Sequence, residues 1–237
     1  MGGFNRKNGR DDIMSLMDCY GLRSTESDDF VEMDGCFVDK EILPYLQGLQ
    51  KLLAQNGFRL RVESAYRSFD RQLSIWNRKA RGELPLLSKD GIVMERPKDE
   101  ENLMYAILTW SALPGCSRHH LGSDIDVVDA QACPEDYEVQ LTTEECDTLF
   151  APFHKKLSEL IVSDSSFGFE RVFVPGRGKI QPEPWHIAHL PTSRRRLENF
   201  SISALKNLYE KSEIACKTAI LDNLNQRAEN YVYPYFV

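Results

Sequence analysis

The sequence predicts a single domain of the α+β class. The chain has 237 residues, of which 42% are hydrophobic, so it is long enough to bury one large core. Segments with the periodicity of helices and short segments with the alternation of strands follow one another at irregular intervals. No segment repeats, and the regular succession of strands and helices that builds a doubly wound parallel sheet is missing.

The first predicted elements are a polar, irregular arm over residues 1–38 and an amphipathic helix over residues 39–55. In this helix apolar side chains recur at three- and four-residue intervals, and Gly57 follows where a helix would end. Residues 58–62 alternate apolar and polar side chains, which predicts a half-buried strand.

Ser68 is placed to cap a second helix that runs to about Arg81. Residues 82–98 are interrupted by Gly and Pro and predict an exposed loop or hairpin, after which residues 100–112 have a helical pattern.

Residues 142–145, TTEE, fit a capping box for a helix that reaches about residue 162, and Pro152 should kink this helix or mark its true start. Residues 169–174 predict a strand and residues 201–224 one or two helices. The aromatic C-terminus, YVYPYFV, indicates a tail that docks on the domain. We expect a catalytic domain over residues 39–190 and a helical extension over residues 191–237 packed on it.

Composition argues against several classes of partner. The formal net charge is −7 and is spread along the chain, which disfavours binding to nucleic acid or to an anionic membrane. The densest basic run, Arg194 to Arg196, is too short for a basic tract and is expected to be a solvated helix start.

Cellular location and redox state give further expectations. No apolar run approaches the ~20 residues of a transmembrane helix, and the first residues lack the apolar segment of a signal peptide. We expect a cytoplasmic protein as the sequence stands, or a periplasmic or extracellular one if a leader has been removed. The six cysteines show no tight repeated spacing and are expected to be mostly buried thiols.

The segment 117–126, SRHHLGSDID, combines two histidines with two carboxylates. If a strand begins after Gly122, Asp124 and Asp126 share one face, and the apolar residues between and after them share the other. His119 lies on the preceding loop and can fold over the carboxylate face. His119 and Asp126 are suitable zinc ligands, but a catalytic zinc needs a third protein ligand.

The third ligand has three candidates, His154, His186 and His189. His154 is flanked by two lysines and is expected to be solvated, and His189 is given at most a supporting role. His186 ends the segment EPWH, in which Glu183 precedes it by three residues. Zinc held by His119, Asp126 and His186 would keep a position open for water, and Glu183 could take the proton of that water. His120 could pack in the domain or contact substrate, and a surface role is favoured over a ligand role.

Three motifs in order then resemble one family. Residues 117–126 resemble a Ser-x-His-x-x-Gly-x-x-x-Asp motif, EPWH resembles Glu-x-Trp-His, and the upstream SAYRS of residues 64–68, followed by Gln72, resembles Ser-x-Tyr-Arg-Ser. These are motifs of the VanY-type zinc D-Ala-D-Ala carboxypeptidases, relatives of the VanX dipeptidases and of the hedgehog fold. The resemblance implies a single hedgehog/DD-peptidase-like domain, with a small antiparallel sheet and flanking helices.

The resemblance also implies roles for individual residues. His119, Asp126 and His186 become the zinc ligands and Glu183 the catalytic base. Arg67 becomes a catalytic cation that polarises the scissile carbonyl or holds a carboxylate, with a structural ion pair as the alternative.

The remaining implied roles concern the surroundings of the centre. Ser117, Gln72 and Tyr66 match positions near the substrate. Asp124 departs from the small residue common in the family and is expected to orient a ligand histidine, while Trp185 should anchor the turn between base and ligand. The Cys-x-x-His spacing of Cys116 and His119 could belong to a structural zinc site, but no second pair accompanies it.

The function implied is that of a zinc metallocarboxypeptidase that removes the terminal D-alanine of peptidoglycan peptides or their precursors. Alternatives on the same site are a D-Ala-D-Ala dipeptidase, an L,D-carboxypeptidase or an endopeptidase. A non-catalytic, hedgehog-like zinc-binding module is the alternative from another class, and the presence of Glu183 argues against it because a purely structural site needs no base.

Overall fold

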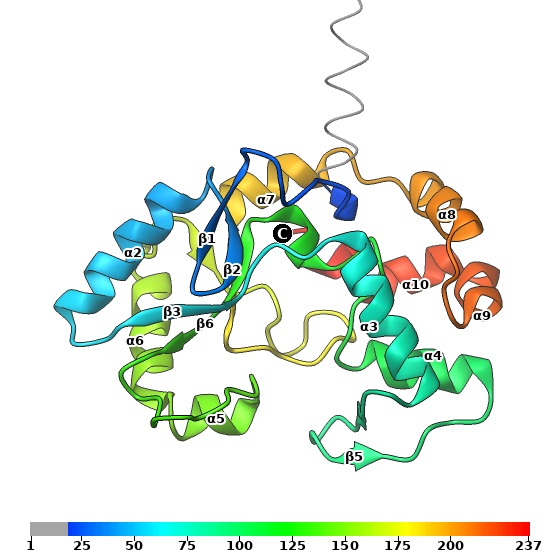
Figure 1. Cartoon of the computed structure of the whole chain (residues 1–237), viewed down its shortest axis with the longest axis horizontal. Coiled ribbons are helices and arrows are strands. Elements are labelled where there is room, and N and C mark those ends of the chain that lie inside the picture. Colours follow the sequence, from blue (N-terminus) through cyan, green and yellow to red (C-terminus); the bar gives the residue numbers. More distant parts are fainter. Residues whose placement is uncertain (1–18) are drawn as a thin grey trace, which may run out of the picture.

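The computed structural model describes residues 19–237, and the rest of the expected arm, residues 1–18, lies outside the described residues. The fold mixes helices with small antiparallel sheets (Figure 1), as the sequence predicts. The strands are β1 (Phe30–Met33), β2 (Cys36–Asp39), β3 (Leu60–Ser64), β4 (Leu86–Leu87), β5 (Val93–Met94), β6 (Asp124–Asp129), β7 (Phe169–Glu170) and β8 (His186–His189). The helices are α2 (Leu43–Gln55), α3 (Phe69–Arg81), α4 (Glu100–Leu108), α5 (Thr143–Asp147), α6 (Ala151–Val162), α7 (Leu190–Leu197), α8 (Ile202–Lys211), α9 (Lys217–Asp222) and α10 (Leu224–Tyr231), with two 3₁₀-helices, η1 (Arg118–Leu121) and η2 (Tyr233–Tyr235).

The central sheet has the strand order β3-β6-β8-β7, and every neighbouring pair is antiparallel. All six residues of β6 are buried. Ile125 and Val127 face a core formed with α2 and α6, which lie at the same side of the molecule in Figure 1. Because side chains alternate along a strand, Asp124 and Asp126 point to the opposite face, as expected.

Residues 30–39 differ from the prediction of an irregular arm. They form the hairpin β1–β2, which turns at Asp34 and Gly35 with φ angles of 52° and 78°. Two left-handed residues in a two-residue loop are typical of a type I′ turn, and Asp-Gly is a preferred pair for it. The hairpin is part of the domain, since Val38 is fully buried in the core beside α2.

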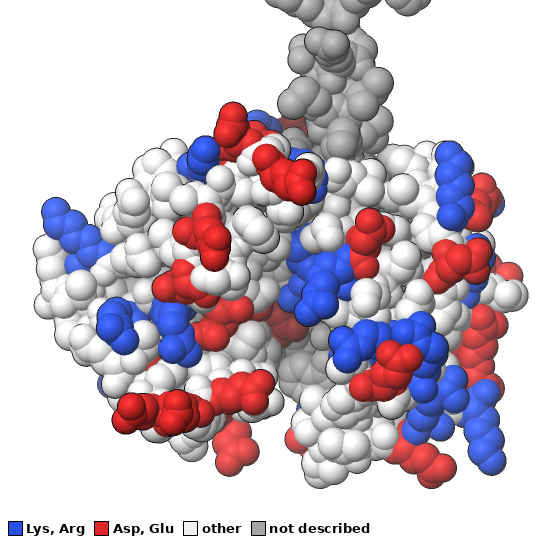
Figure 2. All heavy atoms as spheres, viewed as in Figure 1, with Lys and Arg blue, Asp and Glu red and all other residues white. Residues whose placement is uncertain are grey.

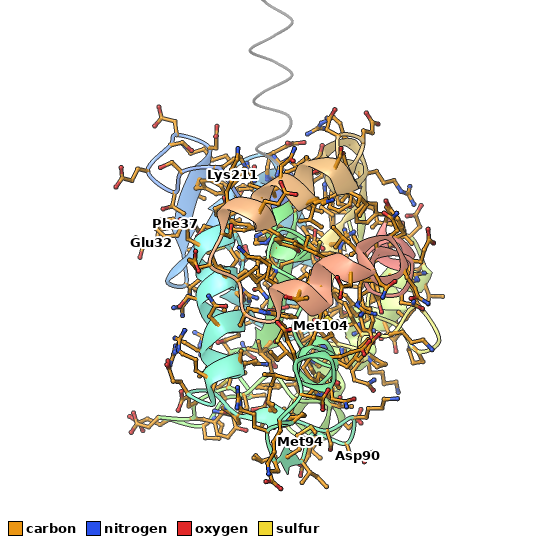
Figure 3. All side chains as sticks on the ribbon, turned by 90° about the vertical axis from the view of Figure 1, so that its right-hand side faces the viewer. Glu32, Phe37, Asp90, Met94, Met104 and Lys211 are labelled. Atoms are coloured by element: carbon orange, nitrogen blue, oxygen red, sulfur yellow. The ribbon has the colours of Figure 1, made fainter. Side chains whose placement is uncertain are left out.

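A second core lies among α3, α4 and the C-terminal helices. The predicted cap is confirmed, because the Ser68 side chain accepts a hydrogen bond from the backbone of Arg71, and α3 ends at Gly82 in a left-handed conformation. Met104 on α4 is fully buried in this core (Figure 3), together with Tyr209 of α8.

Several boundaries differ from the prediction. The helix expected over 142–162 is two helices: Thr142 and Glu145 form the capping box of α5, and Pro152 lies in the first turn of α6. The expected hairpin within 82–98 is present as β4–β5, and Figure 3 shows Asp90 and Met94 at the lower edge of the view. β7 stops at Glu170, so the expected strand over 169–174 is only two residues long.

The distribution of charged side chains on the surface is relevant to nucleic acid and anionic membranes, the two partners that the composition disfavours. Figure 2 shows acidic and basic side chains interspersed over one face, without an extended field of one sign. Arg194 and Arg195 are exposed as expected, but Arg196 is buried and paired with Asp39 and Glu41. In the described part of the chain the longest helices have 13 residues, and none is long and apolar enough to span a bilayer.

Candidate active site

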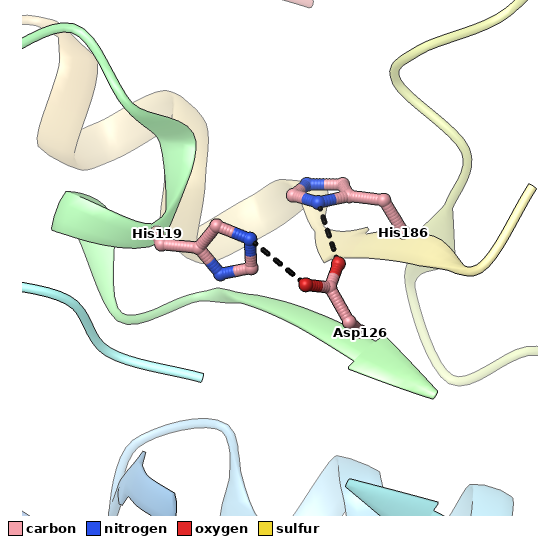
Figure 4. Close-up of side chains that lie close together, drawn as sticks. All are labelled: His119, Asp126 and His186. Atoms are coloured by element: carbon pink, nitrogen blue, oxygen red, sulfur yellow. Dashed lines mark hydrogen bonds and ion pairs between the residues drawn. The ribbon is translucent and has the colours of Figure 1, made fainter. Parts of the chain in front are cut away.

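His119, Asp126 and His186 converge on one face of the central sheet (Figure 4). His119 Nε2 lies 3.2 Å from Asp126 Oδ2, and His186 Nδ1 lies 3.1 Å from Asp126 Oδ1. One ligand atom from each of the three residues lies within 4.8 Å of the others, and all three side chains are buried. Two imidazoles and one carboxylate are a donor set that suits zinc, and three protein ligands are typical of a catalytic zinc site.

Backbone pairing explains why these residues meet. Asp126 on β6 lies directly opposite His186 on β8, and opposed residues of antiparallel strands point to the same face. His119 comes from η1, which ends at Gly122 with a φ of 70°. This left-handed residue turns the chain from η1 into β6 and brings His119 over the strand.

Glu183 is a further carboxylate beside this group, and one of its oxygens lies 3.7 Å from His186 Nδ1. Burial is the main cause that raises the pKa of Glu183 to about 7, with a further contribution from the charge of Asp126. A carboxyl whose pKa lies near neutral pH can both accept and return a proton. The pKa of His186 is also raised, to about 9. Burial alone would lower it, but the hydrogen bonds to Asp124 and Asp126 outweigh the effect of burial.

Asp124 supports His186 from the other side of the ring. Its Oδ1 lies 3.0 Å from His186 Nε2, which leaves Nδ1 directed at Asp126. Arg118 donates to both Asp124 oxygens at 2.5 and 3.3 Å, and it also donates to the backbone carbonyl of Tyr235 at 2.5 Å. The C-terminal tail, whose docking the sequence predicts, is thereby connected to the histidine site.

Arg67 faces the same cavity from the turn between β3 and α3. Its guanidinium donates to Gln72 Oε1 at 3.0 Å and to Ser64 Oγ at 3.1 Å. Its backbone N–H donates to the carbonyl of His119 at 3.1 Å, which ties this turn to η1. Burial lowers the pKa of Arg67, and the negative charge of Asp126 opposes that shift. A half-buried guanidinium beside a carboxylate pair can stabilise negative charge that develops on a substrate.

These groups surround one cavity with a volume of about 230 Å³. It is lined by Arg67, Leu87, Trp110, Ser111, Ala112, Ser117, Arg118, His119, Asp126, Leu141, Phe173, Ile180, Glu183, Trp185 and His186. A second hollow of about 400 Å³ lies between the β4–β5 hairpin and the start of α5, and it shares Leu87, Trp110 and Leu141 with the first. Figure 2 shows the surface hollowed between these two parts of the molecule.

Two of the predicted substrate residues have other contacts. Tyr66 points to the N-terminal part of the described chain. Its ring packs on Phe30 of the β1–β2 hairpin, and its hydroxyl donates to the carbonyl of Arg23 at 2.8 Å. Gln72 is buried behind Arg67 and donates to the carbonyl of Ala112 at 2.8 Å, so it holds Arg67 in place.

The remaining histidines do not join the metal-binding group. His120 has no surface role but packs, fully buried: its Nδ1 lies 2.6 Å from the carbonyl of Arg67, and its Nε2 accepts a hydrogen bond from the backbone of Gly115 at 3.0 Å. This arrangement fixes a neutral ring, in agreement with a pKa that burial lowers to about 3. His189 stacks on Tyr45.

His154, expected to be solvated, is also buried, on the inner face of α6. Its neighbour Arg171 donates to the carbonyl of Pro184 at 2.9 Å and thereby supports the EPWH turn. Cys116 contacts the hydroxyl of Tyr209, not the histidine group.

Sequence reasoning missed Arg118 and Ser64 as parts of the site. Arg118 could have been found, because an arginine beside a predicted buried Asp124 supplies the partner that a buried carboxylate needs. Ser64 could be recognised only from the pairing of β3 with β6, in which it lies opposite Asp126.

A comparison with protein families finds a match to the family described as VanY: D-alanyl-D-alanine carboxypeptidase, over residues 36–192. An uncharacterised protein of Haemophilus influenzae is 26% identical over 127 residues, which covers 52% of this chain and 95% of that protein.

Two solved structures illustrate the similarity to known folds. A mutant of the vancomycin-resistance D,D-pentapeptidase VanY, from a VanB-type resistance cassette and in complex with Zn(II), is 20% identical with a TM-score of 0.47, and the match covers 87% of this chain and 98% of that chain. The LD-carboxypeptidase LdcB is 16% identical with a TM-score of 0.48, covering 82% of this chain and 78% of that chain.

Proposed function

The chain belongs to the VanY D-alanyl-D-alanine carboxypeptidase family, and we propose that it is a zinc-dependent peptidase that removes the terminal D-alanine of peptidoglycan peptides. The observation that carries the proposal is the meeting of Glu183 and the His119–Asp126–His186 group at one cavity. A purely structural metal site would close its fourth position with another ligand and would have no use for a half-buried acid of raised pKa.

The residues divide the chemistry among them. Zinc held by His119, Asp126 and His186 would supply a Lewis acid and lower the pKa of a water molecule beside it. Glu183 accepts the proton of the attacking water on its carboxylate and then donates it to the amine that leaves. The Arg67 guanidinium faces the carbonyl oxygen as negative charge develops there.

Two further residues shape the cavity. Ser117 is buried at the cavity wall directly before η1, where its hydroxyl can contact the substrate backbone. Trp185 lies between Glu183 and His186 in sequence, and its backbone carbonyl accepts a hydrogen bond from Val127 at 3.0 Å. This bond fixes the turn that carries the acid and the imidazole.

Product analysis by mass spectrometry tests the proposal. Purified, zinc-loaded protein is incubated with a muramyl-type pentapeptide that ends in D-alanyl-D-alanine and with the tetrapeptide that lacks the last residue. We expect loss of one alanine from the pentapeptide. Loss of alanine from the tetrapeptide alone would make the protein an L,D-carboxypeptidase, and release of intact D-alanyl-D-alanine would make it a dipeptide-releasing enzyme. No product from either peptide would contradict the proposal.

A further inference from the structure

Lys79 is a half-buried cation that the proposed chemistry does not use. It lies on α3, seven residues after Gln72 and therefore on the same side of the helix. Its Nζ donates to Ser111 Oγ at 2.7 Å. Among the described residues, no carboxylate lies within ion-pair distance of this ammonium.

Such a group is suited to bind an anion. Transfer of a charged ammonium out of water is unfavourable unless the charge is paired, and a neutral hydroxyl compensates only part of that loss. Burial is the main cause that lowers the pKa of Lys79, the charge of Arg67 lowers it further, and the charge of Glu183 opposes both. The influence of Arg67 and Glu183 shows that Lys79 lies in the electrostatic field of the active site.

Ser111 connects Lys79 to the cavity. Ser111 lines the cavity together with Ser117 and Glu183, and its hydroxyl is the atom to which the ammonium donates. An anion that reaches Ser111 from the cavity side therefore meets both a hydroxyl and a nearby positive charge.

The two arginines that line the cavity are already engaged. Arg118 is bound to both oxygens of Asp124 and to the carbonyl of Tyr235. Arg67 is held by Gln72 and Ser64, in the position where it can face the scissile carbonyl. Among the described cations near the cavity, Lys79 has a single hydrogen-bond partner, the neutral hydroxyl of Ser111.

We propose that Lys79 and Ser111 bind the free carboxylate at the C-terminus of the peptide substrate and so restrict the enzyme to cleavage at the chain end. The inference rests on the proposed function, and it adds a residue that determines specificity. A carboxypeptidase must distinguish a terminal carboxylate from a continuing peptide bond, and a charge-assisted hydrogen bond supplies that distinction. Lys79 is separate from the metal-binding group and from the proton-transferring acid.

The test compares two substrates and two proteins. The parent and the Lys79→Gln variant are assayed for kcat/KM on an N-acetylated pentapeptide ending in D-alanyl-D-alanine, as the free acid and as the C-terminal amide. We expect the parent to favour the acid and the variant to lose at least about 10-fold of that preference, because its rate on the acid falls while its rate on the amide is little changed. Equal losses on both peptides, or an unchanged preference, would contradict the proposal. Lys51→Gln, an exposed change on α2, is the matched control and should behave as the parent.

A binding measurement separates this inference from the proposed function. The Kd of each peptide is measured by titration calorimetry on zinc-loaded Glu183→Gln protein, with and without Lys79→Gln, and a circular dichroism spectrum checks that each variant is folded. Tighter binding of the acid that depends on Lys79 would support the inference even if the parent releases no alanine. Turnover by the parent without such dependence would overturn the inference and leave the function intact. If Lys79→Gln fails to fold, Ser111→Ala takes its place with the same expected loss of preference.

Discussion

His186 Nε2 lies 3.0 Å from Asp124 Oδ1, on the side of the ring opposite the Nδ1 atom that faces Asp126. Asp124 is itself fully buried and held by Arg118 and by the hydroxyl of Ser123. The pair fixes both the orientation of the imidazole and the nitrogen it presents, as carboxylates behind metal-binding histidines commonly do. The role that the sequence analysis assigns to Asp124 agrees with this geometry.

Replacement of Asp124 by Asn should weaken zinc binding by about 10- to 100-fold, because the amide cannot supply the negative charge that orients His186. Competition with a chromogenic chelator measures the affinity. Asp129→Asn is the matched control, since Asp129 ends the same strand and accepts hydrogen bonds from the backbone of Arg59 and Gln131 away from the site. Equal affinities for the Asp124 variant and the parent would show that this contact does not act on the metal site.

Gly122→Ala should destabilise the protein by about 2 kcal/mol or more, because a side chain at a φ of 70° is strained and has no room. A Cβ there would lie 2.9 Å from Asp39 Oδ2 and 3.2 Å from Arg196 Nη1, two groups of a buried ion-pair network. Urea unfolding measures the change. Gly57 has a similar φ of 85°, but the space around it is open, so Gly57→Ala should lower the free energy of unfolding by less. Equal losses for the two variants would exclude the ion-pair network as the cause.

His154 should make stability depend on pH. Burial first, and then the charge of Arg171, lowers its pKa in the folded protein to about 3, whereas in the unfolded chain it titrates near its ordinary value of 6.5. Between these values the unfolded chain binds the extra proton, so the stability present above pH 6.5 is lost as the pH falls toward 3. The His154→Gln variant should show a shallower slope of unfolding free energy against pH, by up to ~1.4 kcal/mol per pH unit. Parallel curves for parent and variant would contradict the buried, neutral state of this histidine.

Removal of the metal should abolish turnover without unfolding the protein. The site is held by the backbone pairing of β6 with β8 and by Arg67 and His120, which do not depend on an ion. Dialysis against a chelator is expected to remove activity and leave the far-ultraviolet circular dichroism unchanged, and one equivalent of zinc should restore the rate. Full activity of chelator-treated protein that contains no zinc, or unfolding on metal removal, would contradict this expectation.

The sequence predicts most of the helices because their end signals are local. Ser68 and Gly82 mark the two ends of α3, and Thr142 with Glu145 marks the start of α5. The sequence motifs single out His119, Asp126 and His186, and the structure brings these three side chains together.

The elements that the sequence analysis missed depend on long-range contacts or on signals that were overlooked. β8 is only four residues long and entirely buried, so it shows no alternation of polar and apolar side chains. The β1–β2 hairpin was missed although its Asp34-Gly35 pair is a common signal for a hairpin turn. His154 lies three residues before the buried Leu157, so its place on the inner face of α6 followed from helical spacing despite its lysine neighbours.

The most direct test of the central claim is turnover of the D-alanyl-D-alanine pentapeptide by the Glu183→Gln variant with its zinc content measured in parallel. The account predicts one equivalent of zinc, an unchanged fold and a kcat lower by about 10²- to 10⁴-fold, because the amide cannot accept the proton of the attacking water. Glu170→Gln, an exposed change on β7, should leave kcat as in the parent. A Glu183→Gln protein that holds zinc and turns over at the parent's rate would contradict the assignment of Glu183 as the base.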